Sequence, residues 1–178
     1  MTREGGCMGW LKGFDRKIFN FTLRFSQESL SHKYMRFVSR SGDLGSIWLL
    51  VCIVLMCFPR YRRIVELCLI TLLFTTLLGE GILKHIFRRP RPFITHGPVK
   101  MGIPAPTSFS FPSGHTASSI ACARILAMVS PWMALCAFFY AGLMGFSRVY
   151  LKAHYVSDVV AGGLIGLACA EAVRWFFR

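Results

Sequence analysis

The sequence has 178 residues, of which 54% are hydrophobic, and its mean hydropathy is +0.50. This composition exceeds what a soluble domain of this size usually carries, so it excludes an ordinary soluble protein. Lys and Arg number 21 against 8 Asp and Glu, a formal net charge of +13. Because these charges lie near the N-terminus and between apolar segments, we expect an anionic membrane surface as the partner, and no nucleic acid.

Residues 1–42 form a basic amphipathic segment. Apolar side chains recur there at helical spacing, at Leu11, Phe14, Ile18, Phe21 and Phe25. Basic and amide side chains take the positions between them. The pattern predicts a helix that lies in the membrane surface; the alternative is an ordinary helix packed on the bundle with a solvated face. The segment lacks the apolar core of a signal peptide, so we expect no cleavage.

Residues 43–178 carry the apolar segments typical of membrane helices. These segments cover residues 43–58, 64–83, 115–129, 132–146 and 156–177. We therefore expect one all-α membrane domain over residues 1–178, with a bundle of about five transmembrane helices in 43–178. Most of the seven cysteines fall inside the apolar segments, where they act as small hydrophobic residues, and none has metal-ligand spacing.

Proline and glycine predict the connections. Between residues 88 and 111 they recur too often for a continuous helix, so we expect an ordered or semi-ordered loop that acts as a lid. Ser130 and Pro131 predict the tight turn of a helical hairpin. Each arm of this hairpin has about 15 residues, or roughly 22 Å, against a hydrocarbon core of about 30 Å. A site at the open end of the hairpin would lie at or slightly below the lipid headgroups.

Two further pairs of residues predict helix contacts. Gly162 and Gly166 are four residues apart and let a neighbouring helix approach closely; packing within one chain is favoured over dimerisation, and the oligomeric state stays open. Arg124 and Glu171 are polar residues inside apolar segments at similar depth, away from the polar end. We expect them to pair, because isolated charges in hydrocarbon are costly.

Three short polar stretches interrupt the apolar chain and together carry three cations, two histidines and a carboxylate. They contain Lys84 and Arg91, then Pro112, Ser113, Gly114 and His115, then Ser147, Arg148, His154 and Asp158. These groups can hold a phosphate and attack it. His154 and Asp158 are four residues apart at a predicted helix start, so the carboxylate can accept the Nδ1 proton and leave Nε2 as nucleophile.

The second stretch stands at the start of a predicted helix, where backbone N–H groups and the helix dipole favour an anion. Ser113 is a candidate cap whose hydroxyl could instead turn to a phosphate oxygen, and Gly114 lets the backbone approach that phosphate. Glu80 precedes Lys84 by four residues and either holds or tunes it, or has no role. Charges outside the three stretches are expected to be solvated or lipid-facing, with headgroup selection as the alternative: Arg88, Arg89, His96, Lys100 and Lys152.

The order and spacing of the three stretches resemble the type 2 phosphatidic acid phosphatase (PAP2) superfamily: Lys, six residues, Arg-Pro; Pro-Ser-Gly-His; Ser-Arg, five residues, His, three residues, Asp. The resemblance implies that His154 attacks phosphorus to form a phosphohistidine, oriented by Asp158. His115 would protonate the leaving group and then activate water. The implied phosphate ligands are Lys84, Arg91, Ser113, Gly114 and Arg148, with no metal and no cofactor.

The resemblance thus implies a metal-independent membrane lipid phosphatase. Its substrate would be a phosphomonoester or pyrophosphate on a lipid, of the undecaprenyl pyrophosphate, phosphatidylglycerol phosphate, phosphatidic acid or lipid A 1-phosphate type. The alternatives are a catalytically silent lipid-binding or lipid-moving protein and an enzyme like the vanadium haloperoxidases, which are soluble.

We expect the bacterial inner membrane, with the active site facing the periplasm or exterior. Basic residues at the far end agree with a cytoplasmic face there: Arg60, Arg62, Arg63, Arg174 and Arg178. The basic N-terminal segment, on the active-site side unless it crosses the membrane, opposes this orientation.

Overall fold

Helices make up the regular secondary structure of the computed structural model, which describes residues 6–25, 29–97, 101 and 103–177. The N-terminal part contains α1 (Gly6–Thr22), α2 (Leu30–Ser41), η1 (Asp43–Gly45) and α3 (Ser46–Met56). The middle contains η2 (Pro59–Tyr61), α4 (Arg62–Thr76), the π-helical η3 (Leu77–Leu83), α5 (Lys84–Phe87) and α6 (Pro92–Thr95). The C-terminal part contains α7 (Gly114–Leu126), α8 (Pro131–Tyr150) and α9 (Val156–Phe176). The described residues form no strand, so the predicted all-α class is confirmed.

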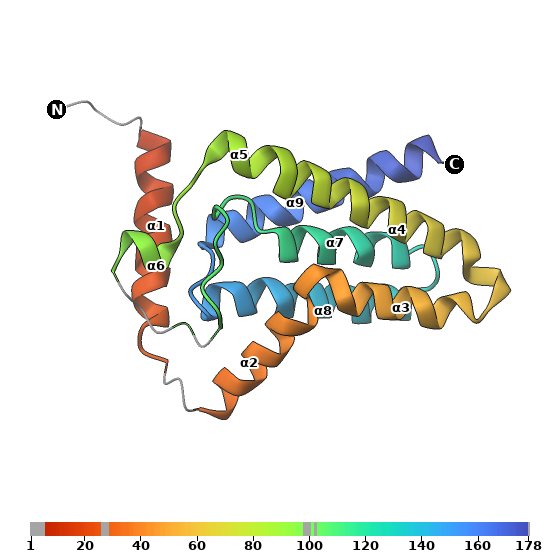
Figure 1. Ribbon diagram of the computed structural model, residues 1–178, viewed down its shortest axis with the longest axis horizontal. Coiled ribbons are helices and arrows are strands. Elements are labelled where there is room, and N and C mark those ends of the chain that lie inside the picture. The colour runs from red at the N-terminus through yellow and green to blue at the C-terminus, as the bar shows by residue number, and fades with distance from the viewer. Residues whose placement is uncertain (1–5, 26–28, 98–100, 102, 178) are drawn as a thin grey trace.

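The long helices α3, α4, α7, α8 and α9 run along one axis, with α7 in the middle of the bundle (Figure 1). Ala117, Ala121 and Ala123 of α7 have no exposed surface, and these small side chains allow close approach by α4, α8 and α9. A Cβ added at Gly162 would lie 2.5 Å from the Ser113 carbonyl oxygen, and one at Gly166 would collide with the Ala117 carbonyl. The glycine pair therefore packs α9 against α7 within one chain, as predicted.

The predicted number of membrane crossings is only partly supported. Among the described residues, Pro59–Thr95, Pro131–Tyr150 and Val156–Phe176 are long and apolar enough to cross a membrane. The helices Leu30–Ser41 and Asp43–Met56 are together long and apolar enough for one span, but they are bent by 57° at the break between them. At 13 residues α7 is too short to cross a membrane. It packs on protein rather than lipid, so it can carry polar residues that lower its hydropathy.

Helix α1 lies across one end of the bundle rather than along it (Figure 1). Asp15, Phe19 and Thr22 form its buried face, whereas the predicted apolar positions Leu11 and Phe14 are exposed. The segment is helical as predicted, but its most buried residues are not those of the predicted apolar stripe, of which Phe25 stacks on Tyr150. The exposed apolar side chains and this orientation support the proposal that α1 lies in the membrane surface.

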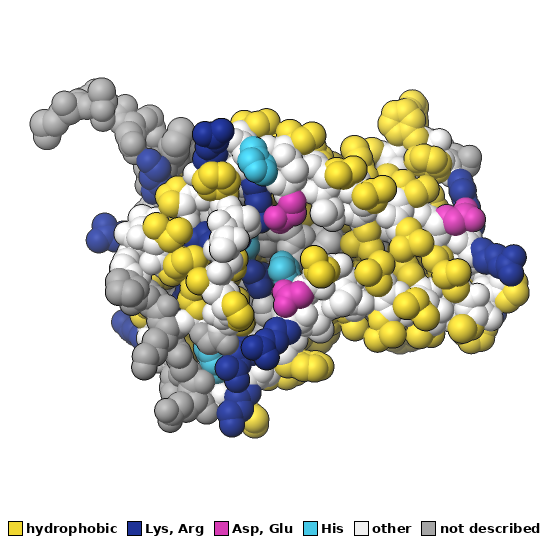
Figure 2. Space-filling view, in the orientation of Figure 1, with side chains coloured by type: hydrophobic (Ala, Val, Ile, Leu, Met, Phe, Trp, Pro, Cys, Tyr) yellow, Lys and Arg dark blue, Asp and Glu magenta, His cyan; other side chains and the backbone are white. Residues whose placement is uncertain are grey.

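The type of side chain at the surface changes along the length of the molecule. Figure 2 shows hydrophobic side chains over the sides of the bundle and Lys and Arg most densely at the end that carries α1 and α2. At the opposite end, Nε of Arg124 lies 2.5 Å from the carboxylate of Glu171, which also binds Arg174 at 2.5 Å. The predicted Arg124–Glu171 pair is therefore confirmed, away from the polar stretches.

Local sequence signals set the ends of several helices. Ser130 caps α8 by accepting the Met133 N–H at 3.2 Å, and Pro131 occupies the first turn, as predicted for the hairpin. The predicted continuous helix over 64–83 instead shifts to a π-helical turn at Leu77–Leu83, where Gly79 and Gly81 flank Glu80. Such turns are frequent at functional sites.

Candidate active site

The three polar stretches meet at one cavity of about 740 Å³. Its lining includes the predicted site residues Lys84, Arg91, Gly114, His115, Arg148 and His154. Lys84 begins α5, Gly114 begins α7, and Arg148 lies in the last turn of α8. Ser113 and Asp158 are completely buried behind this lining.

His154 lines the cavity, and its two ring nitrogens have different hydrogen-bond partners. Nδ1 donates to the Ser110 carbonyl at 2.7 Å, which fixes the proton on that nitrogen. Nε2 lies 3.2 Å from Nη1 of Arg91. Burial, followed by the charges of Arg148 and Arg91, lowers the pKa of His154 to about 3. The imidazole is therefore neutral at physiological pH, and the electron pair on its unprotonated Nε2 accepts a hydrogen bond from Nη1 of Arg91.

His154 and Asp158 lie side by side as predicted, but Nδ1 of His154 hydrogen-bonds the Ser110 carbonyl rather than the carboxylate. Nδ1 lies 3.7 Å from Oδ2 of Asp158, and the carboxylate instead accepts from the Ser110 hydroxyl at 2.5 Å and from Tyr155 N–H at 2.9 Å. The prediction required both residues on one helical face, whereas α9 begins at Val156 and His154 lies before it. The Ser110 hydroxyl donates to the carboxylate of Asp158, and the Ser110 carbonyl accepts from the imidazole of His154. Ser110 therefore links the two side chains.

Three buried cations surround the polar end of the cavity. Arg91 donates from Nε to the Ser108 carbonyl at 2.7 Å and from Nη1 to the Ala153 carbonyl at 2.9 Å. Arg148 donates from Nη1 to Ser39 at 2.5 Å, but its buried Nε has no hydrogen-bond partner among the described residues. A buried donor without an acceptor is costly, so an anion at this position would satisfy it.

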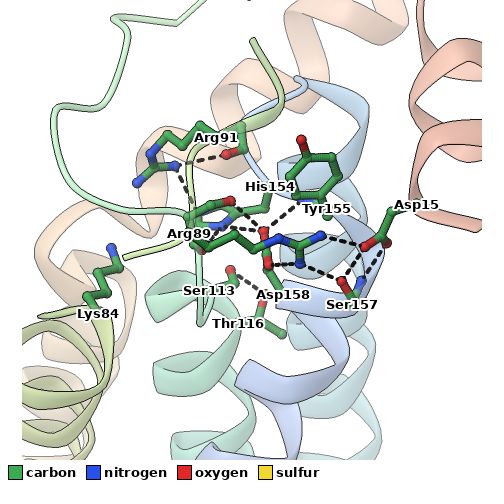
Figure 3. A network of polar contacts seen from close by, with 12 residues as sticks. Asp15, Lys84, Arg89, Arg91, Ser113, Thr116, His154, Tyr155, Ser157 and Asp158 are labelled. Atoms are coloured by element: carbon green, nitrogen blue, oxygen red, sulfur yellow. Dashed lines mark hydrogen bonds and ion pairs between the residues drawn. The ribbon is translucent and has the colours of Figure 1, made fainter. Parts of the chain in front are cut away.

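The second polar stretch differs in part from its prediction. Ser113 does not cap α7 with its side chain; its hydroxyl lies 2.9 Å from that of Thr116 (Figure 3). Whether Ser113 contacts phosphate stays a prediction. Nε2 of His115 lies 2.9 Å from Oδ1 of Asp43, which belongs to the short helix η1. Asp43 can therefore hold a proton on His115.

The expected lid lies over the cavity. Residues 103–108 line it, and Ser108 binds Lys84 Nζ at 3.0 Å and Arg91 Nη2 at 3.1 Å. Apart from the short α6, the described part of this loop is irregular. Ser108 and Ser110 were missed in the sequence because an irregular loop has no periodicity that could reveal which side chains face inward.

The charged residues outside the three polar stretches lie in different environments. Arg89, expected to be solvated, is ion-paired with buried carboxylates. Lys152 is buried, at 3% exposure, whereas Arg88 is exposed and bonds the His85 carbonyl. His96 stacks on Phe19 of α1. Lys100 and Arg178 lie outside the described residues.

Glu80 occupies the cavity beside the cations. Its carboxylate lies 2.7 Å from Lys84 Nζ, and a Cβ on Gly114 would collide with it. Gly114 therefore leaves room at the start of α7 for an anion, and Glu80 partly fills this space. A bound phosphate would compete with the carboxylate for Lys84.

We expect Glu80→Gln to strengthen the binding of inorganic phosphate or vanadate by about tenfold, because the neutral amide removes like-charge repulsion near the anion. The measurement is the inhibition constant at fixed ionic strength. Glu66→Gln, which removes an exposed acid paired with Arg63, is the matched control. Weaker anion binding in Glu80→Gln would instead show that Glu80 holds Lys84 in place.

Comparisons with known proteins identify a family and several relatives of the chain. Residues 63–178 match the family model described as "PAP2 superfamily". The chain is 33% identical over 155 residues to an undecaprenyl-diphosphatase of Sulfolobus acidocaldarius, covering 86% of this chain and 74% of the relative. It spans 16% to 60% of two further lipid phosphatases that it matches.

Two solved structures share the fold over nearly the whole chain. The crystal structure of Aquifex aeolicus LpxE has a TM-score of 0.77 and 26% identity, with 98% of this chain and 99% of that one covered. The transmembrane PAP2-type phosphatidylglycerolphosphate phosphatase of Bacillus subtilis has a TM-score of 0.76 and 26% identity, with 98% and 88% covered.

Proposed function

The chain belongs to the PAP2 superfamily as an integral membrane protein, and on this basis we propose that it hydrolyses a phosphate or pyrophosphate carried on a membrane lipid. One observation carries the proposal: a single cavity joins the neutral Nε2 of His154 and three cations to an apolar wall. The wall is formed by Leu44, Leu49, Leu69, Leu72 and Leu73. Phosphate at the polar end and lipid at the apolar end would fit this division.

In the proposed mechanism, Nε2 of His154 attacks phosphorus while the bond to the leaving oxygen breaks. His115 gives its proton to that oxygen, so the lipid leaves as an alcohol or monophosphate. His115 then accepts a proton from water, which attacks the phosphohistidine and releases inorganic phosphate and free His154. Lys84, Arg91 and Arg148 would stabilise the charge on the phosphoryl oxygens throughout.

Asp158 would act through Ser110 rather than directly. Its carboxylate holds the Ser110 hydroxyl, and the Ser110 carbonyl holds the proton on Nδ1 of His154. The ring then keeps the tautomer that exposes the electron pair on Nε2. Asp43 bonds Nε2 of His115 directly and would support its protonated form, in opposition to the burial that lowers the pKa of His115.

We propose a metal-free reaction, because three fixed cations supply positive charge where a metal would otherwise act. The test is phosphate release from purified lipids in detergent, with and without EDTA. We expect equal rates in both conditions; loss of activity with EDTA, restored by a divalent metal, would contradict the mechanism. A polyprenyl pyrophosphate is the first lipid to test, because an undecaprenyl-diphosphatase is similar over most of this chain.

The panel should also contain phosphatidylglycerol phosphate, phosphatidic acid and lipid A 1-phosphate. Release from none of these lipids would favour the lipid-binding or lipid-moving alternative. A peroxide-dependent halogenation assay on vanadate-loaded protein tests the haloperoxidase alternative.

We further propose that the site faces the periplasm or cell exterior of the inner membrane, with α1 in the anionic surface on that side. The exposed basic residues Arg60, Arg62 and Arg63 at the other end support a cytoplasmic position there. Labelling of single cysteines near Lys17 and Arg60 in a cysteine-free background, from outside intact cells, tests this orientation.

A further inference from the structure

Two carboxylates from distant parts of the chain meet at the start of α9 (Figure 3). Asp158 accepts the Tyr155 N–H at 2.9 Å, and Asp15 of α1 accepts the Ser157 N–H at 3.0 Å and its hydroxyl at 2.5 Å. Asp15 and Asp158 are 3% and 0% exposed. Asp15 thus satisfies backbone at the start of a helix to which it does not belong, and α1 is locked onto α9.

Arg89 lies between the two carboxylates and binds both. Its Nη1 donates to Asp158 Oδ1 at 2.5 Å and to Ser157 at 2.7 Å, and its Nη2 donates to Asp15 Oδ2 at 2.8 Å. The guanidinium carbon lies 4.1 Å from the ring centre of Tyr155. The planar fork of an arginine can satisfy two acids at fixed directions, which a lysine cannot.

The same arginine also holds the peptide that orients His154. The Ser110 N–H donates to the Arg89 carbonyl at 2.8 Å, and the Ser110 hydroxyl donates to Asp158. The Ser110 carbonyl in turn accepts from Nδ1 of His154. Arg89 therefore fixes Ser110 twice, once by its backbone and once through Asp158.

Charge and burial make the arrangement interdependent. Two buried carboxylates side by side repel each other unless a cation lies between them, and a buried charge without a partner is strongly destabilising. If Asp15 is replaced, the Arg89 guanidinium keeps its ion pair with Asp158 but loses the second ion pair, which fixes the orientation of the guanidinium. Without Arg89, Asp15 and Asp158 face each other uncompensated, and the hydrogen bonds to Ser110 lose their fixed geometry.

We propose that Asp15 and Arg89 are positioning residues of the reaction, so that the N-terminal helix α1 holds His154 in its attacking orientation through Asp158 and Ser110. This inference rests on the proposed role of His154 as nucleophile. Neither residue lines the cavity, so neither contacts the substrate. The network is a support behind the imidazole, separate from the cations that hold phosphate.

The first test compares Asp15→Asn and Arg89→Gln with the matched controls Lys17→Gln and Arg88→Gln, which change exposed charges on α1 and beside Arg89. We expect kcat to fall between about tenfold and about a hundredfold in the first pair, because a misplaced nucleophile slows the chemical step. KM should stay within about twofold, since the cavity lining is unchanged. For the controls Lys17→Gln and Arg88→Gln we expect kcat to stay unchanged.

Arg89→Lys keeps the charge but loses the fork, so its kcat should lie between those of the wild type and Arg89→Gln. It also serves as the milder variant if Arg89→Gln fails to fold, as judged by thermal unfolding in detergent. Unchanged kcat in folded Asp15→Asn and Arg89→Lys would overturn the proposal, and so would a loss confined to KM.

The second test is a double-mutant cycle with Asp158→Asn. If Asp15 acts through Asp158, then adding Asp15→Asn to Asp158→Asn should change kcat by less than about twofold. Full additivity of the two losses would overturn the proposal, because it would mean that Asp15 acts by another route. Phosphate release by His154→Ala would contradict both the proposed function and this inference. If His154→Ala is inactive but Asp15→Asn has the kcat of the wild type, only this inference is contradicted.

Discussion

Replacing His154 with alanine is expected to lower kcat for phosphate release by about 10⁴-fold or more, because the reaction loses its nucleophile. The side chain lies at a buried end of the cavity with Nε2 beside Arg91. The measurement is phosphate release from a lipid substrate, together with trapping of labelled phosphate on the protein. Wild-type protein should show an acid-labile phosphoenzyme, and His154→Ala should show none.

His85→Ala is the matched control, because His85 is exposed and lies outside the cavity. An aryl phosphate separates the two histidines of the site, since its leaving group needs no proton. With this substrate His115→Ala should form the phosphoenzyme and then stall, because water is no longer activated. Phosphoenzyme in His154→Ala but not in His115→Ala would reverse the two roles.

Arg148→Met should lower kcat/KM by about 10² to 10³, the usual cost of removing a donor that stabilises transition-state charge. Its buried Nε has no partner among the described residues and is free to bind a phosphoryl oxygen. Arg148→Lys keeps the charge without the paired donors and should lose about tenfold. Thermal unfolding of each variant separates loss of the site from loss of the fold.

The two Arg148 variants should differ in how kcat/KM depends on pH. The Arg148 guanidinium is one cause of the lowered pKa of His154, after burial. Removing this charge in Arg148→Met should raise the pKa of His154, so the acid loss of kcat/KM begins at a higher pH than in the wild type. Arg148→Lys should leave the profile in place. An identical acid limb in wild type and Arg148→Met would contradict the influence of Arg148 on the nucleophile.

The sequence predicted those parts of the site that depend on local spacing. Lys84, Arg91, His115, Arg148 and His154 meet at one cavity because each stands at or next to the end of a helix and the helix ends lie together. The turn at Ser130 and Pro131 was predictable for the same reason, since a cap and a proline act within one helical turn.

The supporting contacts could not be predicted from spacing. Asp15 binds Ser157 across 142 positions of the chain, and no periodicity connects an acid on an amphipathic helix to the start of another helix. Ser110 contacts Asp158 from an irregular loop. The contact between His154 and Asp158 was predictable, but the hydrogen bond from Nδ1 to Ser110 was not: a four-residue spacing sets a shared face only inside a helix, and α9 starts two residues after His154.

The placement of α1 across the end of the bundle has a consequence for membranes of different thickness. Asp15 ties α1 to the first turn of α9, next to the cavity. If α1 rests in the headgroup layer, the scissile bond keeps a constant depth below that layer, whatever the span of the hydrocarbon beneath it. A thicker or thinner bilayer must then adjust at the opposite end of the bundle, where Trp175 and Phe176 are exposed. Turnover should accordingly vary little with acyl chain length in the host membrane.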